Sequence, residues 1–134
     1  MAKRYLLDTN HVSEIIRPIS RLRERMTLEA RCGAVFGACV PVLCELEAGL
    51  HGMASPGQFR NGLRKMLQLS RVWPLEEDLA DAYGVLFREL RQAGRSLSQV
   101  DIMLAAMARS SGLILLTHDR DFEAVQKLKT ESWL

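Results

Sequence analysis

The stretch Tyr5-Leu6-Leu7-Asp8-Thr9-Asn10 is an apolar run that stops at a carboxylate followed by two small polar residues. A short apolar run that ends in residues typical of helix caps predicts a buried strand of a parallel sheet with both faces covered. In open α/β sheets ligands bind beyond the carboxyl ends of the strands, so this pattern predicts Asp8 at the mouth of a site. The alternative is that Asp8 only caps the segment that follows, because Asp, Thr and Asn all satisfy free amides at helix starts.

Strand and helix patterns alternate along the rest of the chain. Apolar runs predict further strands at 34–40, 72–75 and 113–117, and an edge strand at 128–134. Amphipathic or capped segments predict helices at about 12–17, 20–30, 41–50, 59–67, 76–93, 98–111 and 122–125. This alternation is typical of an α/β fold in which a central, mostly parallel sheet has helices on both faces.

Length and composition indicate one domain of ordinary size. The chain has 134 residues, of which 48% are hydrophobic and 6% aromatic, so we expect residues 1–134 to form a single domain with an aliphatic core. The 18 basic and 16 acidic residues leave a formal charge of +2. The overall charge therefore does not indicate a nucleic-acid-binding protein, and any basic surface must be local.

No membrane or export signal is expected from the sequence. The apolar runs are far shorter than the roughly 20 residues of a membrane span, and Lys3-Arg4 precedes only a few apolar residues. We therefore expect a cytoplasmic protein without a membrane partner. The three cysteines lack paired spacing and are predicted to be small core residues: Cys32, Cys39 and Cys44. The three histidines lack metal-ligand spacing and are predicted to have surface or packing roles: His11, His51 and His118.

Three further carboxylates follow predicted element ends. Asp119 comes just after the strand at 113–117 and faces Asp8 if the two strands are neighbours. Glu45 lies about one turn into the helix after the second strand, where the helix dipole alone would also favour it. Asp101 fits this edge less readily, because we expect a helix that leads into a strand to start at the opposite end from one that follows a strand. Ser98 and Asp101 also match a capping box, which is a purely structural alternative.

Four blocks of the sequence together resemble the PIN-domain family, and most closely its VapC-type toxins. The blocks lie at residues 6–10, 45–50, 101–108 and 116–122, and the resemblance covers the whole chain in order and spacing. It implies a three-layer α/β/α nuclease fold whose acidic pocket binds Mg²⁺ or Mn²⁺ and cleaves RNA. The family's acidic residues fall on four positions: Asp8, Glu45, Asp101 and Asp119.

The resemblance also implies a role for each acidic residue. Asp8 and Asp101 would be the principal metal ligands, Asp119 a ligand directly or through water, and Glu45 a residue that orients water or holds a second ion. The spacing of the last block leaves Asp121 as a partner of, or substitute for, Asp119. Asp121 is otherwise expected to cap the last helix. Two small polar residues would support the first carboxylate from behind: Thr9 and Asn10.

The chemistry of a metal nuclease agrees with this residue set. Mg²⁺ prefers oxygen ligands, and divalent ions can activate water and offset charge at the leaving oxygen in phosphodiester hydrolysis. Clustered carboxylates repel one another, so without a cation one or more should take up a proton. Phosphate contacts are expected from basic residues on two helices: Arg21, Arg25, Arg60, Arg64 and Lys65.

Three other functions compete with this interpretation. A phosphatase of the haloacid-dehalogenase type also has an Asp after its first strand, but it needs a second Asp where this chain has Asn10. A receiver domain needs a lysine after a late strand, and the segment 117–119 has none. A PIN-fold module that binds RNA or protein without catalysis is the third alternative, although this chain has all four carboxylates.

The resemblance further implies a homodimer that is inhibited by a small VapB-like antitoxin. Apolar positions of the early helices could leave a groove for an amphipathic partner helix if the thin sheet does not cover them. The alternative is that they pack on the sheet. These positions are Ile15, Ile16, Leu22, Met26 and Leu28.

Overall fold

The computed structural model describes residues 2–134 and alternates strands with helices along the chain. The strands are β1 (Arg4–Leu7), β2 (Val35–Cys39), β3 (Arg71–Trp73), β4 (Ile114–Leu116) and β5 (Lys129–Glu131). The helices are α1 (Thr9–Ile15), α2 (Arg21–Arg31), α3 (Val40–His51), α4 (Gly57–Leu69), α5 (Asp78–Gln92), α6 (Gln99–Ser111) and the 3₁₀ helix η1 (Arg120–Ala124). Each predicted strand and helix is present, with its ends shifted by a few residues.

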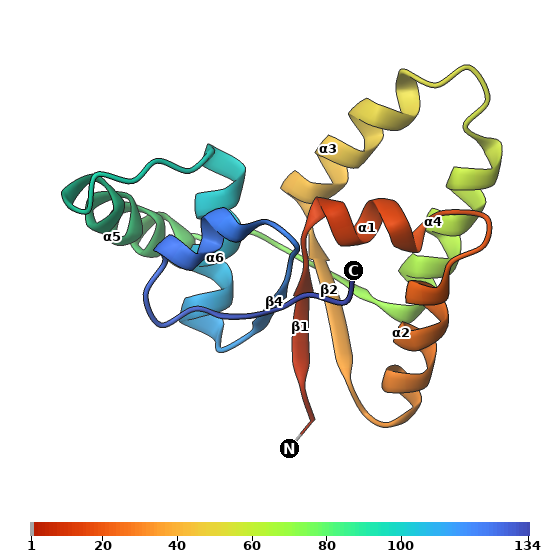
Figure 1. Cartoon of the computed structure of the whole chain (residues 1–134), viewed down its shortest axis with the longest axis horizontal. Helices are drawn as coiled ribbons and strands as arrows, with labels where there is room; N and C mark the ends of the chain where they lie inside the picture. The colour runs from red at the N-terminus through yellow and green to blue at the C-terminus, as the bar shows by residue number, and fades with distance from the viewer. Residues whose placement is uncertain (1) are drawn as a thin grey trace.

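The five strands form one parallel sheet between two groups of helices (Figure 1). Helices α1 to α4 lie on one side, and α5 and α6 lie on the other. The strand order is β3-β2-β1-β4-β5. The chain adds β2 and β3 on one side of β1 and then adds β4 and β5 on the other side, so the strand order switches between β1 and β4. The predicted three-layer fold is confirmed, and a switch point of this kind is where α/β sheets bind ligands.

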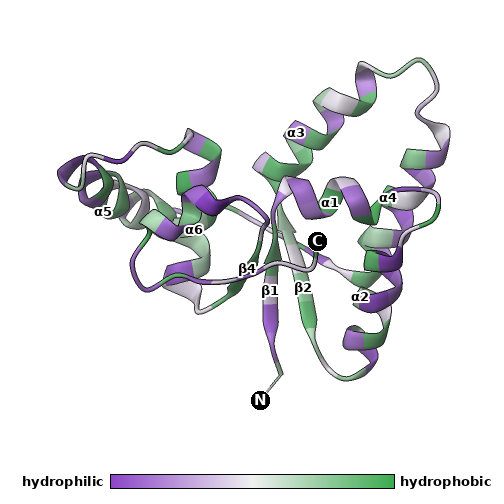
Figure 2. Ribbon diagram, in the orientation of Figure 1, coloured by the Kyte–Doolittle hydropathy of each residue, from purple (hydrophilic) through white to green (hydrophobic). Residues whose placement is uncertain are grey.

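The core is centred on the two middle strands. Leu6 and Leu7 of β1 and Leu115 and Leu116 of β4 are all buried, as expected for strands covered on both faces. Figure 2 shows hydrophobic colour along β2 and β4, and hydrophilic colour in the segment that follows β4. Leu7 pairs with Leu116, and this register places the residues that follow β1 beside those that follow β4.

The C-terminal residues pack against the sheet through aromatic rings. Tyr5 stacks on Phe36 at 5.3 Å between ring centroids, and Trp133 packs edge-on against both rings at 5.2 and 5.7 Å. The chain end crosses in front of β1 and β2 (Figure 1). Aromatic pairs at these distances add stability beyond the area that they bury, so the last residues are part of the fold.

The prediction that all three cysteines are core residues is wrong, and for the early helices the alternative of packing on the sheet holds. Of the three cysteines only Cys39 is a core residue, since Cys32 and Cys44 are exposed. The apolar residues of the early helices do not form an open groove, because all but Leu28, which is 61% exposed, are buried against the sheet and the neighbouring helices. Among residues 2–134 no helix is both long and apolar enough to cross a bilayer.

Candidate metal centre

Asp8 lies at the switch point, at the end of β1, and is 5% exposed. One carboxylate oxygen accepts a hydrogen bond from the Thr9 backbone N–H at 2.7 Å, and the other accepts one from the Thr117 hydroxyl at 2.7 Å. Asp8 is therefore the N-cap of α1 and at the same time faces the strand ends. This cap starts α1 at Thr9, three residues before the predicted start. Burial raises the pKa of Asp8, the two hydrogen bonds lower it, and Glu45 and Asp119 raise it further.

Glu45 reaches the same edge from α3. This helix starts directly after β2 with a proline in its first turn, so its N-terminal end lies at the carboxyl ends of the strands. The Thr9 hydroxyl donates a hydrogen bond of 2.7 Å to Glu45 Oε1. The Thr9 side chain thus holds Glu45, while the Thr9 backbone N–H supports Asp8 as predicted.

Asp101 lies in the first turn of α6, and its backbone N–H donates to the Ser98 hydroxyl at 3.1 Å. The capping alternative therefore holds, and it does not exclude a place in the site. Burial raises the pKa of Asp101, a hydrogen bond from Ser98 lowers it, and the charges of Asp8, Asp119 and Glu45 raise it again. The carboxylate of Asp101 is thus within electrostatic reach of the other three.

The expectation that α6 would start at the opposite edge is wrong. Gly112, with φ of +67°, ends α6 in a left-handed turn, and β4 begins two residues later. A helix that turns directly into a strand runs antiparallel to it, so the helix starts where that strand ends. Asp101 is therefore brought to the carboxyl ends of the strands by the ordinary geometry of the fold.

Asp119 has the capping role that was expected of Asp121. The Oδ1 atom of Asp119, not a side-chain oxygen of Asp121, caps η1, because it accepts the Asp121 backbone N–H at 2.8 Å. The Asp119 backbone N–H donates to the Thr117 hydroxyl at 3.0 Å, which holds Asp119 close to β4. The charge of Asp119 raises the pKa of both Asp8 and Asp101. The side chain of Asp121 is exposed.

Thr117 was not predicted to have a role in the site. Its hydroxyl donates to Asp8 Oδ2 and accepts from the Asp119 backbone, so one side chain positions two of the acidic residues. Asn10 supports the same group more loosely, since its Nδ2 lies 3.4 Å from Asp8 Oδ2 and 3.5 Å from the Thr117 hydroxyl. The available signal was a hydroxyl residue at the end of β4, in register with Asp8.

His11 is a second residue whose contacts were not predicted, and it connects the site to the C-terminal end of the chain. Its imidazole is fully buried, and Nε2 accepts the Trp133 backbone N–H at 3.0 Å. The ring proton is therefore on Nδ1, which donates to Asn10 Oδ1 at 2.8 Å. Burial lowers the pKa of His11 to about 4, and the neighbouring His118 lowers it as well. His11 is consequently neutral at pH 7.

The four carboxylates suit a hard divalent cation. Within residues 2–134 none of them forms an ion pair with a lysine, arginine or histidine. The same part of the chain has no three acidic, histidine or cysteine side chains close enough to enclose one ion. Mg²⁺ keeps several waters and needs only one or two carboxylates in direct contact, so the donor set of oxygen atoms without nitrogen or sulfur fits Mg²⁺ or Mn²⁺.

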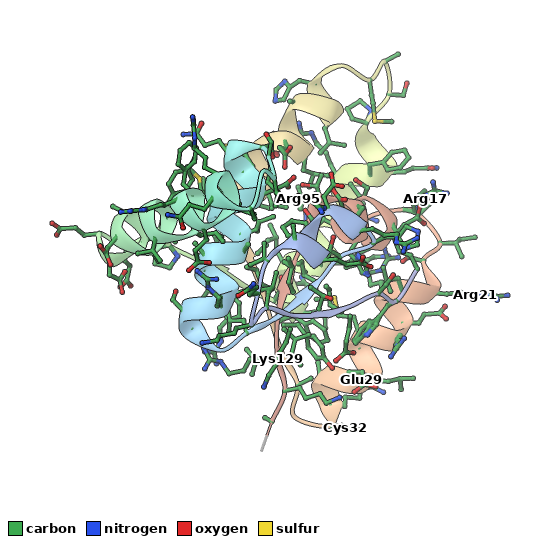
Figure 3. The ribbon with its side chains drawn as sticks, turned by 60° about the vertical axis from the view of Figure 1, so that its left-hand side comes forward. Arg17, Arg21, Glu29, Cys32, Arg95 and Lys129 are labelled. Carbon is green, nitrogen blue, oxygen red and sulfur yellow. The ribbon has the colours of Figure 1, made fainter. Side chains whose placement is uncertain are left out.

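Three of the five basic residues predicted to contact RNA have contacts within the protein. Arg60 donates two hydrogen bonds to the Glu47 carboxylate, at 3.1 and 2.9 Å, and the Arg25 guanidinium lies 3.9 Å from the Trp133 ring centroid. Arg64 donates to Asn61 on its own helix. Arg21 extends outward from α2 (Figure 3), and Lys65 is exposed on α4.

Comparisons with known proteins agree with this geometry. Residues 5–128 match the PIN domain family. The ribonuclease VapC2 of Haemophilus influenzae is 31% identical over 134 residues, which cover 98% of each chain. The structure is similar to that of VapBC2 from Rickettsia felis bound to a promoter DNA fragment, with a TM-score of 0.87, 23% identity and coverage of 98% and 99%. It is also similar to a DNA-bound VapBC from Salmonella typhimurium, with a TM-score of 0.83, 26% identity and full coverage of both chains. The four-block resemblance is thus confirmed, and the chain belongs to the PIN-domain family, with VapC proteins as its relatives.

Proposed function

We propose that this chain is a Mg²⁺- or Mn²⁺-dependent endoribonuclease that hydrolyses RNA phosphodiester bonds as the toxin of a toxin–antitoxin pair. The observation that carries the proposal is the placement of four carboxylates within electrostatic reach of one another at the β1/β4 switch point, with no cationic side chain of residues 2–134 paired to them. The ribonuclease name of the Haemophilus influenzae relative supports the activity. We further propose that residues 1–134 act as one nuclease domain in the cytoplasm. Membership of the PIN-domain family excludes the dehalogenase-like phosphatase.

Each acidic residue has a distinct part in this mechanism. Asp8, Asp101 and Asp119 would hold the cation, directly or through water, and Glu45 would orient a water at the scissile phosphate or hold a second ion. A bound divalent ion supplies an activated water and offsets the negative charge that develops on the phosphate and the leaving oxygen. The protein contributes by holding these carboxylates in place before substrate binds.

The neighbouring polar residues keep the carboxylates aligned. Thr117 fixes the Asp8 oxygen and the Asp119 backbone, while the Thr9 hydroxyl fixes Glu45. Asn10 supports Asp8 more weakly. Asp121 contributes its backbone N–H to Asp119, so we assign its carboxylate no contact with the ion.

RNA is the proposed substrate, and it must be attracted by groups outside the acidic cluster. Arg21 and Lys65 form no ion pair within the described chain. A phosphate would have to compete with Glu47 for Arg60 and with the Trp133 ring for Arg25. We therefore propose weaker phosphate contacts for the paired arginines and for Arg64.

We also propose a small VapB-like antitoxin and a second copy of this chain as partners. The Salmonella typhimurium structure is of VapBC, and the two chains align over their full lengths. Exposed apolar side chains of the α3–α4 region give this chain a surface that a partner could cover: Val40, Met53 and Leu67.

Cleavage of RNA in the presence and absence of metal tests the proposal. The purified full chain is incubated with total RNA in Mg²⁺, in Mn²⁺ and in EDTA, and the RNA ends that it releases are sequenced. We expect internal cleavage with either metal and none in EDTA, and co-expression with the adjacent reading frame should suppress it. Cleavage that continues in EDTA, or none with any metal, would refute the proposed chemistry.

A further inference from the structure

A cleft of about 290 Å³ lies where α5 ends and α6 begins, outside the group of four carboxylates. Phe87 and Arg91 from α5 line it, together with Arg95 and Ser96 from the connection between the two helices. Within the part of the chain that the structure describes, no aspartate or glutamate lines this cleft. Its surface therefore combines an aromatic ring with two positive charges.

The two arginines of the cleft have no carboxylate partner among residues 2–134. Other arginines of the chain are held by acids, such as Arg109 by Glu89 at 2.8 Å and Arg60 by Glu47 at 2.9 Å. The C-terminal charge of α5 explains a cation at Arg91, but Arg95 lies beyond the helix end. The charges of the cleft are thus available to an external anion.

The backbone beneath Arg95 is fixed. Gly94, with φ of +68°, ends α5 in a Schellman motif, in which the Gly94 N–H donates to the Arg91 carbonyl at 3.1 Å and the Arg95 N–H donates to the Leu90 carbonyl at 2.8 Å. The helix end consequently fixes the backbone positions of both arginines, and this lowers the entropy cost of holding an anion between their side chains.

The aromatic ring is unusually accessible for its type. Phe87 is 41% exposed, and the Arg91 guanidinium lies 5.8 Å from its ring centroid. An exposed ring beside guanidinium groups is the combination with which proteins bind single-stranded nucleic acid, since bases stack on the ring and phosphates contact the cations.

The cleft and the acidic site share the first turn of α6. Ile102 lines the cleft, and the preceding residue is Asp101. Figure 1 shows the connection between α5 and α6 at the same end of the molecule as the starts of α3 and α6. Figure 3 shows Arg95 well apart from Arg17 and Arg21, so this cleft is separate from the arginines of the α1–α2 side.

We propose that this cleft is a substrate subsite that binds single-stranded RNA next to the scissile phosphate, with Arg91 and Arg95 on the RNA backbone and Phe87 stacked on a base. The proposal rests on the proposed ribonuclease function. It also supplies what the acidic site lacks, because four carboxylates repel a polyanion and nearby cations must hold it. An acidic segment of a protein partner is the competing occupant.

The test compares charge-removing variants on the same surface. The variants are Arg91→Gln, Arg95→Gln, their double variant and Phe87→Leu, and the matched control is Arg88→Gln, an exposed arginine of α5 that does not line the cleft. Binding of a fluorescent single-stranded oligoribonucleotide is measured by anisotropy over a range of salt, in an Asp8→Asn background that prevents cleavage. KM and kcat are measured with otherwise wild-type chains, and thermal melting checks the fold.

We expect the double variant to bind RNA about tenfold more weakly and its salt dependence, d log K/d log [salt], to lose about 0.7 per missing phosphate contact. Phe87→Leu should weaken binding by about tenfold through lost stacking. KM should rise more than kcat falls, and Arg88→Gln should behave as wild type. Unchanged affinity and KM in the double variant, or an equal loss in Arg88→Gln, would overturn the proposal.

The outcomes separate this subsite from the proposed function. RNA cleavage that is unaffected by the variants would refute the subsite and leave the nuclease standing. RNA binding that depends on Arg91 and Arg95 in a chain that cleaves no RNA would support RNA binding by the cleft and overturn both the nuclease and the cleft's role as a substrate subsite. Loss of a co-expressed acidic partner, with RNA binding unchanged, would assign the cleft to that partner and overturn the proposal.

Discussion

At the scale of single residues, the Thr117 hydroxyl has the most specific contacts of the site. The hydroxyl donates to the Asp8 carboxylate and accepts the Asp119 backbone N–H, so the hydroxyl proton points toward Asp8. A buried carboxylate that loses such a donor is left partly unsatisfied, which costs about 1–3 kcal/mol. Thr117 thus stabilises the charged form of Asp8, whose pKa burial has raised.

Thr117→Val should retain the shape of the side chain and remove both hydrogen bonds. We expect RNA cleavage to fall by about 10- to 100-fold, as is typical when a group that supports a metal ligand is lost. Thr117→Ser restores the hydroxyl and should recover most of the activity. A valine variant with wild-type cleavage would mean that Asp8 is held in place by other groups.

His11 gives the stability of the protein a defined dependence on pH. Its pKa in the folded chain, about 4, lies below the ordinary value of 6.5, so the unfolded chain binds its proton first. The contribution of neutral His11 is therefore complete above pH 6.5 and is lost as the pH falls from 6.5 toward 4. The expected loss is about 2–3 kcal/mol.

Urea unfolding of the wild type and of His11→Gln at several pH values measures this contribution. The glutamine oxygen can accept the Trp133 N–H but does not titrate, so the variant should lose less stability between pH 6.5 and 5. Comparing the two chains cancels the titration of the carboxylates. Parallel pH profiles in the two proteins would show that His11 is not buried in its neutral form.

At the scale of elements, two glycines in helices have opposite surroundings. A Cβ atom at Gly62 of α4 would collide with the backbone of Ile16, at the end of α1. A Cβ atom at Gly84, in the middle of α5, would meet no atom within 4 Å. The close approach of α4 to α1 therefore requires glycine, whereas α5 has glycine at a position where alanine is the better helix former.

Gly62→Ala should destabilise the chain by several kcal/mol, because a backbone atom cannot move aside as a flexible side chain can. Gly84→Ala should raise the free energy of unfolding by about 0.5–1 kcal/mol. Chemical denaturation of both variants provides the comparison. Equal effects of the two substitutions would show that α4 does not pack closely on α1.

The element scale also shows what the sequence could predict and what it could not. Asp8, Glu45 and Asp119 were predictable because each follows the end of a strand closely, and that placement depends only on local pattern. For Asp101 only the resemblance to the family indicates the site, since the expectation drawn from topology places the start of α6 at the wrong end of the sheet, although the short turn at Gly112 fixes the direction of α6 relative to β4. The role of Thr117 depends on the pairing register of β1 with β4, and the bond from Trp133 to His11 joins residues far apart in sequence. Neither has a signature in local periodicity.

At the scale of the whole molecule, the fold gathers negative charge at the point where the sheet changes direction. The raised pKa values of Asp8 and Asp101 mean that ionising these groups costs free energy in the folded chain. For a carboxylate with a raised pKa, this cost is absent at low pH and complete at neutral pH, so the metal-free protein is destabilised there.

Divalent ions should therefore raise the melting temperature at pH 7 by mass action, and less at pH 4.5, where the site is partly protonated. Asp8→Asn keeps the cap of α1 and removes one charge, so its melting temperature in EDTA should equal or exceed that of the wild type. Scanning calorimetry with and without Mn²⁺ tests both points. The same metal-induced rise in both chains would indicate non-specific binding.

The most direct test of the account measures Mn²⁺ binding and RNA cleavage in the same samples. Electron paramagnetic resonance counts the bound ions while gel analysis follows the RNA, for the wild type, Asp8→Asn, Asp101→Asn, Asp119→Asn and, as the matched control, Asp121→Asn. We expect the first three variants to lose both tight Mn²⁺ binding and cleavage, and Asp121→Asn to retain both. Full cleavage by Asp8→Asn or Asp101→Asn, or loss of activity in Asp121→Asn with Asp119→Asn still active, would contradict this expectation.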